Sequence, residues 1–145
     1  MLLLLSGGVR KPHKQKFCER TASIVSVLEK KRGSTVRFSK LDLSKSMKVG
    51  DHPDKYLDRE RCARDDSCFV SVKRHPAFWP AIIRAETLCT KVDILLVICR
   101  SGRHRSVGVI RQLEIDFEGS IVGADLESSS WDTIALISRF LEGLP

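Results

Sequence analysis

The segment CRSGRHRS, at residues 99–106, gathers the residues of this chain that are best able to do chemistry. It follows the apolar run ILLVI and precedes a second apolar stretch, so we expect it to join a buried strand to a helix. Where a strand of a parallel sheet ends, backbone N–H groups and the positive end of a helix dipole favour anions. The sequence therefore predicts an anion-binding loop. Its residues are Cys99, Arg100, Ser101, Gly102, Arg103, His104, Arg105 and Ser106.

The residue types in this segment suit a phosphate or carboxylate ligand. Gly102 permits a tight backbone path, and the planar fork of Arg105 matches two oxygens of such a group. Cys99 is placed at the base of the loop, where amide groups would stabilise a thiolate. Simpler readings stay open at this point, with the cysteine as a small buried apolar residue and two of the arginines as solvated charges.

The spacing resembles the signature of the cysteine-dependent protein tyrosine and dual-specificity phosphatases. That signature is a cysteine, two residues, a glycine, two residues, an arginine and then serine or threonine. The resemblance implies a catalytic set in which the Cys99 thiolate attacks phosphorus while Arg105 holds the phosphoryl oxygens. Asp66, upstream, is available to protonate the leaving group. The histidine that usually precedes the cysteine in these enzymes is Ile98 here.

The run GRHRSV is more closely similar to the C-terminal domain of the RapZ (RNase adapter protein) family, whose loop reads GCTGGxHRSV. Upstream, the segment ARDDSCFVSVKRHPAF is similar without gaps to that family's TGLDxxVxxYVxxHPEAxxF. His52 and Arg59 fall where the family has the histidine of NPH and the arginine of LRP, so the resemblance implies two further ligand contacts there. The matched upstream residues are Asp65, His75, Pro76 and Phe78.

This second resemblance spans residues 41–126 and implies a regulatory binding domain without a cofactor. Its expected partners are a phosphorylated amino sugar or similar small molecule, RNA and further copies of the chain. Arg100 and Ser101 replace small residues of the family's loop, which favours a polyphosphate or nucleic-acid backbone over the sugar. Nothing resembles the family's nucleotide-binding domain, and the GxxxxGK[ST] motif is absent from the sequence. A phosphatase, or a scaffold that binds an acidic protein, remains an alternative.

Composition and charge agree with an anionic partner in a reducing compartment. The 145 residues include 25 Lys and Arg against 18 Asp and Glu, a formal net charge of +7. The five cysteines form no CxxC pair and no metal-ligand pattern with the histidines, so we expect no metal, no disulfide and a cytoplasmic location. The opening MLLLL is too short for a signal peptide or a membrane span, and it reads as a first buried strand.

The elements that must position the loop alternate between strand and helix. This order predicts a single α/β domain over residues 1–145, a three-layer sandwich with a mainly parallel sheet of about four strands and flanking helices. The predicted strands are residues 2–5, 35–43, 93–98 and 120–126. The predicted helices are residues 20–32, 80–91, 107–119 and 131–143. Residues 44–67 form a long polar segment of the kind that is often functional.

Overall fold

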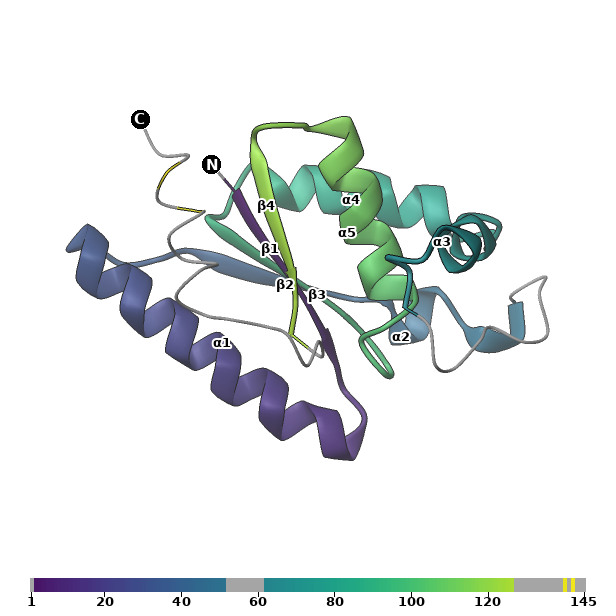
Figure 1. Cartoon of the computed structure of the whole chain (residues 1–145), viewed down its shortest axis with the longest axis horizontal. Coiled ribbons are helices and arrows are strands. Elements are labelled where there is room, and N and C mark those ends of the chain that lie inside the picture. Colours follow the sequence, from purple (N-terminus) through teal and green to yellow (C-terminus); the bar gives the residue numbers. More distant parts are fainter. Residues whose placement is uncertain (1, 52–61, 127–139, 141, 143–145) are drawn as a thin grey trace.

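Four parallel strands form one sheet in the computed structural model, which describes residues 2–51, 62–126, 140 and 142 (Figure 1). The strand order is β2-β3-β1-β4, with helix α1 on one face and helices α3, α4 and α5 on the other. The predicted α/β sandwich is therefore confirmed. The strands are β1 (Leu2–Gly8), β2 (Phe38–Asp42), β3 (Ile94–Cys99) and β4 (Ile121–Asp125). The helices are α1 (Lys11–Arg32), α2 (Leu43–Ser46), α3 (Asp66–Lys73), α4 (Phe78–Cys89) and α5 (Arg105–Asp116), with a 3-10 turn at Val49–Asp51.

The two central strands, β1 and β3, are apolar on both faces because each face is covered. All six residues of β3 are buried, and its ladder with β1 runs from Leu3 opposite Ile94 to Gly8 opposite Cys99. Alternate side chains of these strands point into two separate clusters, one against α1 and one against α4 and α5. Continuous apolar runs are the expected sequence of strands buried in this way.

The carboxyl ends of β1 and β3 form a switch point in the topology. β1 leads into α1 on one face of the sheet, whereas β3 leads into α5 on the other (Figure 1). Loops that leave neighbouring strands toward opposite faces create the crevice in which α/β proteins usually bind ligands. The loop at residues 99–106 lies at this point.

The structure differs from the predicted elements mainly in the polar parts of the chain. Helix α1 begins at Lys11, nine residues before the predicted start, with a proline in its first turn. The long polar segment at 44–67 contains α2, the 3-10 turn and the start of α3. The helix predicted at 131–143 lies outside the described residues, apart from Phe140 and Glu142. Phe140 is buried in the cluster against α1.

Among the described helices, none is both long enough and apolar enough to cross a membrane.

Asp93 fixes the start of β3 against β2 and the end of α1. Its backbone N–H donates to the Arg37 carbonyl at 2.8 Å, and the Arg37 N–H donates to Asp93 Oδ2 at 2.9 Å. The guanidinium groups of Arg32 and Arg37 lie 3.3 and 3.5 Å from the same oxygen. Burial alone would raise the pKa of this carboxyl, but the hydrogen bonds from Arg37 and the charge of Arg32 outweigh burial and lower the pKa.

Replacing this carboxylate should make stability less dependent on pH. A carboxyl whose pKa is lower in the folded chain stabilises the fold above its unfolded pKa of about 3.9, and that stabilisation is lost as pH falls through the folded value. Asp93→Asn should lower the free energy of unfolding by about 1 kcal/mol at pH 7, and the difference should shrink below about pH 4. Urea unfolding at several pH values measures this. Glu118→Gln, an exposed change of the same charge, is the control, and a difference independent of pH would contradict the prediction.

Candidate functional site

Cys99, the last residue of β3, lies at the base of the loop with 1% of its surface exposed. Its Sγ is 3.2 Å from the Ser106 hydroxyl and accepts a hydrogen bond from the Gly102 N–H at 3.3 Å. Gly102 has a φ of 74°, which residues with a Cβ rarely adopt. The left-handed turn thus brings the backbone of the loop back toward the sulfur.

Three carbonyl groups of the loop are bonded to segments outside it. The backbone pairs are Val9 N–H to Cys99 and Arg10 N–H to Arg100, both at 3.0 Å, and Ala63 N–H to Arg103 at 2.9 Å. A trans peptide points its N–H opposite to its carbonyl, and the described residues contain no cis peptide. The amides of the next residues, which are Arg100, Ser101 and His104, therefore point away from these neighbours. Amides that converge on one point form an anion cradle, and the Gly102 N–H is directed at the Cys99 sulfur.

Arg105, the first residue of α5, is a buried cation with 6% of its surface exposed. Its Nη1 donates to the Met47 carbonyl at 2.6 Å, on the segment that follows α2. Within the described part of the chain, no ion pair joins this guanidinium to a carboxylate. A buried charge without a partner of opposite charge is costly, so this side chain can still gain from an anion.

The other predicted loop residues differ in exposure. Arg100 and Arg103 are exposed, Ser101 and His104 are partly buried, and Ser106 is fully buried. His104 takes the N-cap position of α5 without a side-chain capping bond. The exposed Arg100 can therefore meet a ligand from solvent, while the buried Ser106 hydroxyl contacts the Cys99 sulfur.

His75, which matched the upstream motif, contacts the same segment that Arg105 of the loop contacts. It is 2% exposed, and its Nδ1 accepts from the Ala77 N–H at 3.0 Å, so its Nε2 carries the proton and donates to the Lys48 carbonyl at 2.8 Å. Lys48 directly follows Met47, which Arg105 contacts. Asp65, another matched residue, accepts from the Ser67 N–H at 3.1 Å and caps α3. Both residues thus have structural partners in the fold.

Asp66, the predicted leaving-group acid, pairs with Arg111 of α5 and has a side chain that is 90% exposed. Arg111 lies more than one helical turn beyond Arg105. Among the described contacts, none joins Asp66 to the loop at 99–106. The two remaining predicted contacts, His52 and Arg59, lie outside the described residues.

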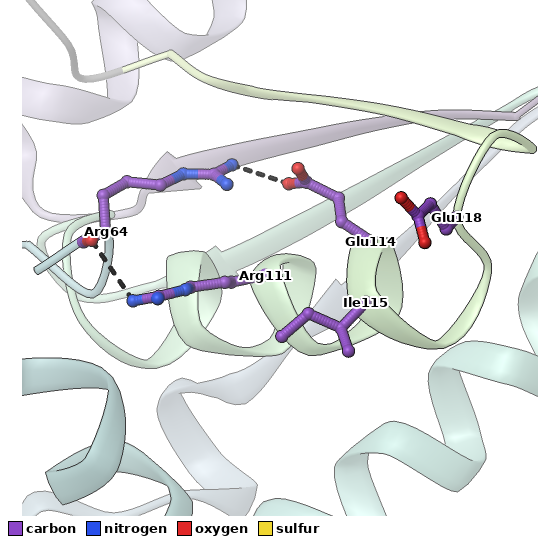
Figure 2. Close-up of a pocket in the computed structure, with 5 residues that line it drawn as sticks. All are labelled: Arg64, Arg111, Glu114, Ile115 and Glu118. Atoms are coloured by element: carbon purple, nitrogen blue, oxygen red, sulfur yellow. Dashed lines mark hydrogen bonds and ion pairs between the residues drawn. The ribbon is translucent and has the colours of Figure 1, made fainter. Parts of the chain in front are cut away.

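Arg64 is a positioning residue that the sequence did not reveal. Its Nη2 donates to Glu114 Oε1 at 2.7 Å, and its Nε donates to Asp125 Oδ2 at 2.8 Å (Figure 2 shows the Glu114 contact). Burial would lower the pKa of Arg64, but these hydrogen bonds outweigh it and raise the pKa. Asp125 also accepts from the Ser6 hydroxyl at 3.1 Å. The segment around Arg64 is thereby tied to α5, β4 and β1, next to the Ala63 N–H that holds the loop.

We call Arg64 and its two carboxylate partners, Glu114 and Asp125, the Arg64 clamp. A shallow depression of about 380 Å³ lies beside this clamp (Figure 2). It follows α5 toward its C-terminal end, away from Cys99, and Arg64 and Glu114 within it already neutralise each other. This depression therefore offers an anion no unpaired arginine among Arg64 and Arg111. The residues that line the depression are Arg64, Arg111, Glu114, Ile115 and Glu118. No group of three His, Cys, Asp or Glu side chains in the described residues could hold a metal ion.

The fold and the loop define an α/β sandwich domain with a cysteine and an arginine at its switch point. Comparison of the chain with models of protein families, with curated proteins and with solved structures finds no match. The geometry of the loop is therefore the feature that indicates its function.

Removing the Arg64 clamp should destabilise the fold and loosen the loop. Arg64→Met leaves Asp125 and Glu114 without their cation, so the free energy of unfolding should fall by about 1–3 kcal/mol. A double-mutant cycle with Asp125→Asn should give a coupling of at least about 0.5 kcal/mol. Arg84→Met, a change at an exposed arginine of α4, is the control. Equal effects of the two arginine variants in urea unfolding would contradict the assignment.

Proposed function

We propose that this chain is a binding domain for phosphorylated ligands, which holds a phosphoryl group on the loop at residues 99–106. The observation that carries the proposal is Arg105, a buried guanidinium whose described partner is a neutral carbonyl. A phosphoryl oxygen would supply the missing negative charge. The amides of the loop and the N-terminal end of α5 would bind the other oxygens.

The ligand class and setting follow the RapZ resemblance. We propose a phosphorylated small molecule of the amino-sugar phosphate kind as the ligand and RNA as a further partner, with the net charge of +7 as support. We also propose self-association and a cytoplasmic location. None of the five cysteines forms a disulfide in the described structure, which suits a reducing compartment.

Arg105→Gln should weaken phosphate binding while the fold persists. Losing the buried cation should reduce the affinity for inorganic phosphate and for a hexosamine 6-phosphate by at least about tenfold, equivalent to about 1.4 kcal/mol. Isothermal titration calorimetry measures the affinities, and circular dichroism verifies the fold. Arg84→Gln, with the same loss of charge, should bind as the wild type does. Binding that is unchanged in Arg105→Gln, or absent in the wild type, would refute the proposal.

A cysteine phosphatase is the second candidate, and the contacts of Cys99 favour it. The Gly102 N–H and the Ser106 hydroxyl lie where they could stabilise a thiolate. In such an enzyme the sulfur forms a bond to phosphorus as the bond to the leaving oxygen breaks, and that oxygen takes a proton from an acid. Because Asp66 is exposed and paired with Arg111, binding is better supported than turnover.

The variant Cys99→Ser distinguishes a binding domain from a cysteine phosphatase. A binding domain should show no turnover of an aryl phosphate in reducing buffer, and this variant should keep its affinity for inorganic phosphate within about threefold. Turnover by the wild type that disappears in Cys99→Ser would establish the phosphatase instead. In that case Asp66→Asn should lower the rate by about 10²-fold or more.

A further inference from the structure

The charged residues in the segments that meet at the switch point are all basic. Residues 1–18 and residues 94–113 each contain four Lys or Arg and no Asp or Glu. Carboxylates occur at the ends of the two outer strands, but each is already engaged. Asp42 accepts from the Ser44 N–H at 2.9 Å, and Asp125 binds Arg64 and Ser6. Within the described residues, no ion pair joins Arg10, Arg100 or Arg105, at the centre of this edge, to a carboxylate.

Arg10 and Arg100 are held side by side within this basic region. The Arg10 N–H donates to the Arg100 carbonyl at 3.0 Å, so the exit of β1 and the loop after β3 are in direct contact. Both residues are exposed, and in the described structure neither side chain has a hydrogen bond or an ion pair. The first turn of α1, which starts after Arg10, contains no acidic residue. Cations on two neighbouring residues repel each other, and an anion bound between them would offset that repulsion.

We propose that Arg10 and Arg100 form a second phosphoryl subsite beside the loop, and that the ligand is a small molecule with a diphosphate group. This inference rests on the proposed function, in which the buried Arg105 and the loop amides hold the first phosphoryl group. Arg100 directly follows Cys99, so the second subsite adjoins the first. Two phosphoryl groups that share one oxygen fit such a short separation better than successive phosphates of a nucleic acid, which a sugar separates.

The test compares inorganic phosphate, pyrophosphate and a single-stranded RNA 12-mer as ligands of the full chain. Pyrophosphate should bind at least about tenfold more tightly than phosphate, because the second group gains charge-assisted hydrogen bonds. The double variant Arg10→Gln/Arg100→Gln should remove this advantage, so that it binds pyrophosphate no more than about twofold more tightly than it binds phosphate. Lys30→Gln/Lys31→Gln carries the same charge change in the last turn of α1, and it should keep the advantage.

Each other outcome overturns a specific part of the inference. Equal affinity for phosphate and pyrophosphate in the wild type, or equal losses in the two double variants, would show that no second subsite exists. RNA that binds more tightly than pyrophosphate and loses this affinity in Arg10→Gln/Arg100→Gln would assign the arginine pair to a nucleic-acid backbone instead. If Arg105→Gln binds phosphate as the wild type does, the proposed function is wrong. If phosphate binding depends on Arg105 but pyrophosphate binds no more tightly than phosphate, only the second subsite is wrong.

Discussion

The pairing of β1 with β3 continues beyond the two strands, and the candidate site depends on it. After Gly8 and Cys99 face each other in the ladder, the next two N–H groups of the β1 exit still donate to carbonyls of the β3 loop. These bonds direct the two carbonyls toward the β1 exit, so the amides that follow point away from it. Without this extension the same carbonyls could turn into the loop, and their partial negative charge would repel an anion. The sheet thus fixes the position of the loop and the direction of its first two carbonyls.

Other segments fix the loop from the remaining sides. Arg105 and His75 donate to two consecutive carbonyls, those of Met47 and Lys48. Arg105 thereby binds the segment after α2 to the start of α5, and His75 binds it to the connection between α3 and α4. On the other side, the Ala63 N–H holds the Arg103 carbonyl, and Arg64 anchors this connection to β4. A loop held in this way has little conformational freedom left to lose when a ligand binds, which favours affinity.

The sequence predicted what local patterns determine. The strand predicted at residues 93–98 and the helix after the basic loop are correct to within a few residues, because an unbroken apolar run and a helical apolar spacing each lie within one short segment. The first half of α1 was missed because most of residues 11–19 are polar and they include a proline. Helix α3 was missed because its eight residues depend on the Asp65 cap and on Phe69 and Val72 packing in the core. The clamp of Arg64 joins residues 50 and 61 positions apart, a distance over which no local pattern operates.

The carboxylates around the loop distinguish binding from catalysis, since both functions would use the same cradle. Binding needs only donors, and the loop has them in its amides and Arg105. Turnover also needs an acid close to the leaving oxygen. Four nearby carboxylates serve other partners, and freeing one would break a helix cap or an ion pair. These are Asp42, Asp65, Asp66 and Asp125. In the described chain the donors of the loop thus support the proposed binding of a phosphoryl group, while these four acids hold the fold together around the loop.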